Sequence, residues 1–189
     1  HSQPALVLLG HIHIPTDHPP VYYPGSPCGL DIGETGVRRF LVLDTDDATL
    51  TSHTTRTDVV FFSERFVVLP EEGEADRLGA EITERISGWS LDQDMRQRVR
   101  VRIDAEGYCE NREQIRDVLV EGFSEFTCHD EAPRLDNLLV NDSPALISLA
   151  TKVRERIDGI DWEWGGNEPE RADSLLAALA IVYGTESSS

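Results

Sequence analysis

The amino-acid sequence predicts an α+β fold, with short strands first, strands and helices alternating in the middle, and helices toward the end. Apolar runs of four or five residues, bounded by glycine, proline or aspartate, occur before residue 70 and are typical of strands. A helical apolar spacing begins at Leu78 and returns after residue 143. Between these parts, Val99, Val101 and Ile103 alternate with arginines, which is the pattern of a strand with one buried face.

The first predicted strand ends in a pair of histidines. The apolar run Ala5–Leu9 lies between Pro4 and Gly10 and predicts a strand buried on both faces. His11 and His13 follow, and residues two apart in an extended chain point to the same side. Neutral imidazole is a common ligand of divalent transition metals, so both are candidate metal ligands. Two loop histidines that face solvent are the alternative.

Two further motifs follow the histidines in order. Tyr-Pro-Gly-Ser-Pro occupies residues 23–27, and Leu-Asp-Ile-Gly-Glu occupies residues 30–34. Together with Gly-His-Ile-His at residues 10–13, they resemble the C-terminal part of SbcD-type DNA repair exonucleases, which are calcineurin-like metallophosphoesterases. The resemblance implies that residues 1–55 form the terminal strands of a metallophosphoesterase sandwich. It also implies two divalent metal ions, with manganese expected, in an intact enzyme that hydrolyses phosphodiester bonds.

The other metal-binding motifs of that family do not occur in this chain. Asp-x-His, a Gly-Asp segment and Gly-Asn-His-Asp are all missing. Because two imidazoles cannot fill the first shell of an ion, we expect an incomplete site and no catalytic residue within this chain. The chain is then the C-terminal portion of the enzyme and inactive alone, with the remaining ligands either truncated or lost.

Gly25 and Ser26 are candidate substrate-binding residues beside the metals. Glycine allows a tight turn with close backbone approach, and the serine hydroxyl or nearby amides could contact a phosphate. A purely structural turn is the alternative. Phe40–Leu43 is a further apolar run, ended by aspartates, and predicts another buried strand followed by a turn.

Residues 56–133 are expected to form a small α+β domain of the ferredoxin-like kind. In the related exonucleases such a cap domain helps to hold DNA. The first predicted elements are a hairpin or one bent strand over residues 59–69 and a helix through Leu78, Ile82 and Ile86. A strand through Val99–Ile103 follows. Then come a helix that is capped by Asn111 and ends near Gly122, and a returning strand over Phe123–Cys128.

A row of arginines runs through this domain. Arg96, Arg98, Arg100 and Arg102 fall on one face of the predicted strand, and Arg98, Arg100 and Arg102 are candidate contacts for a phosphate backbone. A solvated face balanced by nearby acids is the alternative. The net charge of −18 has the wrong sign for phosphate binding by the bulk surface, although a local basic stripe remains compatible with it.

Residues 134–189 are expected to form a helical tail. Ser143 caps one helix, whose apolar stripe is Leu146, Leu149, Val153 and Ile157, and Asn167 opens the last helix. The resemblance implies an SbcC-like coiled-coil ATPase as a partner, docked through these helices and through Trp162 or Trp164. Packing of the helices on their own cap domain is the alternative, and a homodimer stays open.

The sequence therefore favours the C-terminal region of a DNA exonuclease that acts in double-strand-break repair. Two alternatives are a non-catalytic module that binds DNA or the ATPase, and a calcineurin-like phosphoesterase for small phosphodiesters. The three cysteines are few and far apart, which is typical of a reducing compartment. We expect a cytoplasmic protein without a membrane-spanning segment.

Overall fold

The computed structural model describes residues 6–141, 143–162 and 170–184. The fold is mixed α and β, as predicted, and the chain divides into two compact units. Unit 1 comprises residues 1–63, 89–102 and 125–129, and unit 2 comprises residues 64–88, 103–124 and 130–189. The division falls within β6 (Val60–Val68) and β7 (Val99–Cys109), so each of these strands contributes to both units.

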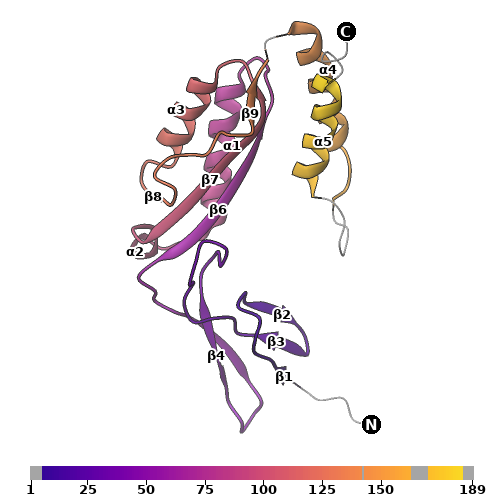
Figure 1. Ribbon diagram of the computed structural model, residues 1–189. Helices are drawn as coiled ribbons and strands as arrows, with labels where there is room; N and C mark the ends of the chain where they lie inside the picture. Colours follow the sequence, from indigo (N-terminus) through magenta and orange to yellow (C-terminus); the bar gives the residue numbers. More distant parts are fainter. Residues whose placement is uncertain (1–5, 142, 163–169, 185–189) are drawn as a thin grey trace. The chain divides into compact units, whose positions relative to one another are not determined.

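Unit 1 contains two small sheets made of short strands (Figure 1). The first sheet joins β3 to β1 in parallel and to β2 in antiparallel orientation, and the second is the antiparallel hairpin of β4 and β5. The hairpin closes where the Asp44 amide donates to the Thr49 carbonyl at 2.8 Å. The strands are β1 (Val7–Leu8), β2 (Thr16–His18), β3 (Val21–Tyr23), β4 (Arg39–Leu43) and β5 (Leu50–Thr54).

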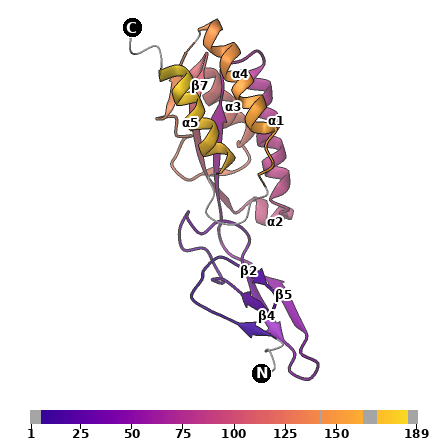
Figure 2. The same ribbon diagram turned by 90° about the vertical axis from the view of Figure 1, so that its right-hand side faces the viewer.

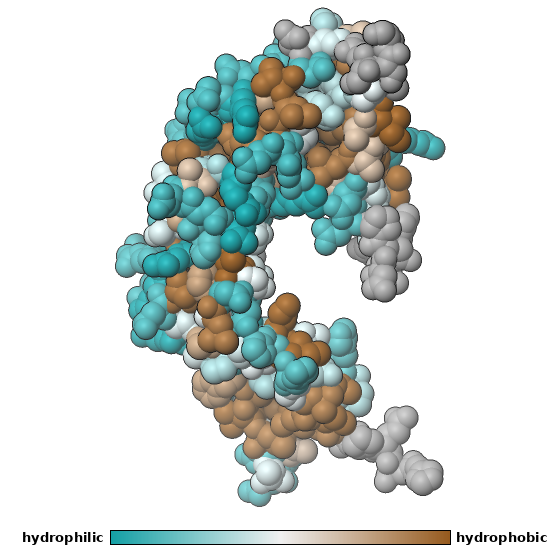
Figure 3. All heavy atoms as spheres, viewed as in Figure 1, coloured by the Kyte–Doolittle hydropathy of each residue, from teal (hydrophilic) through white to brown (hydrophobic). Residues whose placement is uncertain are grey.

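Apolar side chains remain exposed on both small sheets. Leu8 and Leu9 are 44% and 40% exposed, so the predicted strand buried on both faces is wrong. Within the described part of the chain, β1 has two residues and pairs with β3 alone, so few described residues cover its two faces. The strand predicted at Phe40–Leu43 exists as β4, but Phe40 and Val42 are also about half exposed. Figure 3 shows a broad apolar surface over this part of the chain.

The two long strands of the larger sheet place alternate side chains on opposite faces in unit 2. Residues 59–69 contain one strand, β6, rather than a hairpin. On one face, Phe66 lies edge to face with Phe123 and beneath the Arg85 guanidinium of helix α1 (Glu74–Gly88). Helix α3 (Arg112–Gly122) packs beside α1, as Figures 1 and 2 show. The buried residues of this face include Val68, Ile103, Ala105, Cys109, Ile82, Ile115 and Leu119.

The opposite face carries helices α4 (Pro144–Asp158) and α5 (Arg171–Gly184). Tyr108 of β7 stacks on Tyr183 of α5, with ring centroids 3.9 Å apart. Because Tyr108 and Cys109 are neighbours in a strand, they point to different layers. The apolar core on this side comprises Leu69, Ala150, Ile157, Leu175, Leu179, Val182 and Tyr183.

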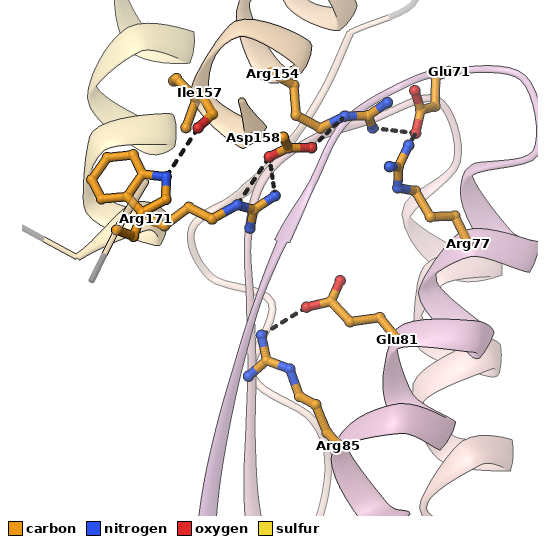
Figure 4. Close-up of polar contacts among 9 residues, drawn as sticks. Glu71, Arg77, Glu81, Arg85, Arg154, Ile157, Asp158 and Arg171 are labelled. Carbon is orange, nitrogen blue, oxygen red and sulfur yellow. Dashed lines mark hydrogen bonds and ion pairs between the residues drawn. The ribbon is translucent and has the colours of Figure 1, made fainter. Parts of the chain in front are cut away.

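A chain of ion pairs joins these helices to the segment around α1 (Figure 4). Glu71 accepts hydrogen bonds from both Arg77, at 2.8 Å, and Arg154 of α4. Arg154 Nε also lies 3.9 Å from Asp158, whose carboxylate accepts from Arg171 Nε at 2.9 Å. We call these five residues the Glu71 ion-pair chain. All of them except Asp158 line a cleft of about 50 Å³ within unit 2.

Several predicted details of the second half change in the structure. The Asn111 side chain caps α3 by accepting from the amides of residues 113 and 114, as predicted. The returning strand is only β8 (Thr127–Cys128), which runs parallel to β7. An unpredicted strand, β9 (Leu138–Val140), also runs parallel to β7. The ferredoxin-like topology stays a prediction.

The predicted apolar stripe of α4 is wrong in part. Leu149 is 48% exposed, while Ala150 and Arg154 are buried instead. The Trp162 indole is half-buried and donates from Nε1 to the Ile157 carbonyl at 2.9 Å. Trp164 and Asn167 lie outside the described residues. Within the described residues, no helix is long and apolar enough to cross a lipid bilayer.

Candidate metal-ligand site in unit 1

The segment after β1 turns sharply at the first candidate histidine. His11 has φ of +79°, so the chain from residue 11 to residue 13 is not extended. The expectation that His11 and His13 point to the same side therefore loses its basis, because side-chain alternation holds only for extended backbone. Both histidines are exposed, and neither is packed into a core.

Glu34 is the centre of the site. His13 Nδ1 lies 2.5 Å from Oε1 of Glu34, within hydrogen-bond distance. The second oxygen, Oε2, accepts from the Ser26 hydroxyl and from the Leu30 amide, both at 3.1 Å. The Glu34 side chain is only 14% exposed, whereas that of His13 is 53% exposed. The hydrogen bond from His13 is the largest cause that lowers the pKa of Glu34, and burial opposes it.

The Gly25–Ser26 turn packs directly under His13. Gly25 has φ of +82°, and a Cβ at this position would lie 2.8 Å from the His13 carbonyl oxygen. The Ser26 amide donates to the same carbonyl at 2.9 Å. The Ser26 hydroxyl is engaged by Glu34 rather than pointing free. These contacts account for the turn structurally, and a phosphate contact by Gly25 and Ser26 stays a prediction.

Arg38 is a buried residue that contacts the backbone of His13. Its side chain is only 2% exposed, and Nη1 donates to the His13 carbonyl at 2.7 Å. Nη2 lies 3.9 Å from Oε2 of Glu34. The Arg38 guanidinium therefore fixes the His13 carbonyl through a hydrogen bond and places a positive charge near the Glu34 carboxylate. The backbone and the side chain of His13 are therefore both fastened.

His13 fits a metal ligand, but the described residues do not supply a complete site. Histidines that bind metals almost always donate their other ring N–H to a carboxylate or carbonyl, and His13 has the Glu34 carboxylate in the matching place beside Nδ1. That arrangement leaves Nε2 of a half-exposed ring for an ion. Among the described residues, no group of three or more histidines, cysteines and carboxylates could hold a metal ion together. His13 therefore suits one position of a shell whose other ligands come from elsewhere.

The predicted arginine row does not form one face of a strand. Arg96 belongs to the short helix α2 (Gln93–Arg96), pairs with Glu125 and lies over the Phe126 ring. This placement corrects the prediction for Arg96, because the Asp92 cap starts a helical turn before β7 begins. The remaining three arginines are Arg98, Arg100 and Arg102.

These three arginines differ in their surroundings. Arg98 lies just before β7 and donates to Asp94, at 3.0 and 3.1 Å, and to the Thr57 carbonyl. Arg100 is exposed within β7, and Arg102 is half-buried on the same face. Arg98 therefore already has a carboxylate partner, and Arg100 is the arginine best placed to meet a phosphate. DNA binding by this row stays a prediction.

Sequence reasoning missed Glu34 and Arg38 as members of the site. Glu34 stands in one of the motifs that support the family resemblance, so its place in that motif was a usable signal. Arg38 gave no signal, because arginine is usually exposed and nothing in the sequence marks this one as buried.

No protein-family model matches this chain, and no curated protein sequence matches it either. The family therefore enters as a proposal that rests on the motifs and on the geometry around His13.

Proposed function

We propose that this chain is the C-terminal region of a metal-dependent DNA exonuclease that acts in double-strand-break repair. The observation that carries the proposal is the arrangement of His13, which is held through Nδ1 by a mostly buried carboxylate and leaves Nε2 for an ion. The three motifs that surround this contact supply the family. In such an enzyme the two metal ions activate water and stabilise an in-line displacement at phosphorus.

The exposed apolar surface of unit 1 also supports the proposal. Soluble proteins rarely leave large contiguous apolar patches uncovered, and such patches usually mark contact surfaces. The small sheets of unit 1 expose Leu8, Leu9, Phe40, Val42 and Leu43. The occupant that we propose is the metal-binding part of a metallophosphoesterase domain, since β1 leads directly to His13. That part would bring the missing carboxylate and histidine ligands.

The partners follow from the same proposal. Double-stranded DNA ends would contact the cap through Arg100 and its neighbours, and a coiled-coil ATPase would contact the α4–α5 helices. The exposed side chains of Leu149 and Ile181 on those helices, 48% and 71% exposed, are compatible with such a contact. A cytoplasmic location belongs to this proposal as well.

The first test is the gene sequence upstream of residue 1, and the second is a nuclease assay. Codons upstream of residue 1 should encode Asp-x-His and Gly-Asn-His-Asp. The polypeptide that includes them should release nucleotides from end-labelled linear DNA when Mn²⁺ is present. His13→Asn should lower the rate by at least about 100-fold, because losing a ligand costs more than losing its orienting partner. His18→Asn is the matched control, since His18 is also exposed, and it should leave the rate unchanged.

The opposite results would overturn the proposal. Upstream codons without these motifs would remove the family assignment. Equal activity of the His13→Asn variant and the wild-type protein would remove the metal-ligand role.

A further inference from the structure

The Glu34 carboxylate has two hydrogen bonds besides its contact with the His13 ring. Oε2 accepts from the Leu30 amide and the Ser26 hydroxyl, which leaves Oε1 for the imidazole. The loop itself is closed by the Glu34 amide, which donates to the Asp31 carbonyl at 3.0 Å. The Ser26 hydroxyl and the Leu30 amide therefore orient the carboxylate without any bound ligand.

We propose that Glu34 is a positioning residue that holds His13 in its Nδ1–H tautomer and so keeps Nε2 bare for a metal ion. The tautomer part stands on the geometry alone, and the metal part rests on the proposed function. Glu34 does not need to touch the ion or the substrate. It acts through His13.

The hydrogen-bonding capacity of the two groups supports this assignment. An ionised carboxylate can only accept hydrogen bonds, and a neutral imidazole has one donor and one acceptor nitrogen. With the proton on Nε2, the bare Nδ1 would face a carboxylate oxygen at 2.5 Å, and two lone pairs would repel each other. A glutamate side chain is ordinarily ionised at neutral pH, and Oε2 of Glu34 already accepts from Ser26 and Leu30. The Nδ1–H tautomer is then the only neutral form that satisfies the contact.

Hydrogen bonds to the His13 backbone also limit how its ring can be oriented. Arg38 Nη1 and the Ser26 amide both donate to the His13 carbonyl, at 2.7 and 2.9 Å. They fix the point from which the side chain leaves, and Glu34 fixes the ring at its Nδ1 edge. With both ends held, Nε2 faces away from Glu34. Orientation of this kind typically changes metal affinity by about 10–100-fold.

The test is nuclear magnetic resonance of the chain labelled with ¹⁵N-histidine. Two-bond ¹H–¹⁵N correlations distinguish the protonated ring nitrogen from the bare one. The measurement is made at about pH 8.5, roughly two units above the ordinary histidine pKa, so that the neutral rings dominate. His13 should show the Nδ1–H tautomer in the wild-type chain. Glu34→Gln should shift it toward Nε2–H, because an amide can donate to Nδ1.

Glu72→Gln is the matched control, since Glu72 is exposed, and it should leave the His13 tautomer unchanged. Mn²⁺ titration gives the second readout. It should broaden the His13 signals at about 10–100-fold lower concentration in the wild-type chain than in the Glu34→Gln variant.

The outcomes separate the two proposals. An Nε2–H tautomer in the wild-type chain would overturn the positioning role, and that readout needs no variant to fold. An unchanged tautomer in a folded Glu34→Gln variant would overturn it as well. The expected tautomer behaviour with equal Mn²⁺ midpoints in the two chains would keep the tautomer assignment and overturn the role of Glu34 in metal affinity, whereas the nuclease is judged separately by the upstream codons and the exonuclease assay.

Discussion

Arg154 is the residue whose loss should destabilise unit 2 most clearly through electrostatics. It is the middle member of the Glu71 ion-pair chain, and its side chain is only 10% exposed. Arg154→Ala removes a guanidinium that pairs with Glu71 and lies near Asp158. The Glu71 side chain, 12% exposed, would keep only its bond to Arg77, which is itself half exposed.

The magnitude follows from this burial. Removing one partner of a buried ion pair costs about 3–5 kcal/mol, because the other charge stays buried without its partner. Arg77 still shields Glu71, so the expected loss lies near the lower end, at about 3 kcal/mol. For a chain of this size, that corresponds to a fall in Tm of roughly 6–12 °C.

The assay is urea and thermal unfolding followed by circular dichroism, with hydrogen exchange of the α4 and α5 amides. Arg116→Ala is the control, because Arg116 and Glu113 form an exposed pair three residues apart on α3. Such pairs contribute only about 0.2–0.5 kcal/mol. The double variant Arg154→Met with Glu71→Gln should recover much of the loss, since neither charge is then left alone. If Arg154→Ala were no less stable than the control variant, the chain of ion pairs would have no structural role.

Three further predictions concern other parts of the chain. Gly25→Ala should destabilise unit 1 by about 1–3 kcal/mol in urea unfolding, because it forces a side chain into a positive φ, whereas Gly10→Ala, with open space around it, should be neutral. Burial raises the pKa of Glu74 in the folded chain above its value in the unfolded chain. The protonated carboxyl group therefore stabilises the fold fully below the unfolded-state pKa, and this contribution is lost as the pH rises through the folded-state pKa. Glu74→Gln should therefore raise the urea midpoint at neutral pH, and this gain should vanish in acid. Arg100→Glu should weaken binding of double-stranded DNA and reduce the salt slope by about one, while Arg116→Glu should not; equal affinities would remove the arginine row as a DNA contact.

The parts of the fold that follow from local chemistry could be predicted from the sequence. The Asn111 cap needs only the amides of the next helical turn. In β7, apolar and polar side chains alternate because one face of the strand is buried along its whole length. The predicted stripe of α4 was wrong at Leu149, which is exposed, and it omitted Arg154, which is buried and pairs with a carboxylate 83 residues away in the chain. Local spacing carries no information about such a partner.

The same distinction applies to the candidate site. His13 could be found because glycine, histidine and the strand before it are contiguous. Its pairing with Glu34 spans 21 residues and depends on a turn at Gly25 and a buried arginine at position 38. The burial of β1 and β4 was wrong because an apolar run predicts a need for cover without saying which polypeptide segment provides it.

Because β7 packs against helices on both of its faces, its length should vary little among orthologues. Insertion or deletion of one residue in its middle would turn every later side chain to the opposite face. Tyr108 would then lose its stacking partner on α5, and Cys109 would leave the layer of α1 and α3. Orthologues should therefore keep β7 at constant length and accept insertions in the aspartate-rich turn between β4 and β5.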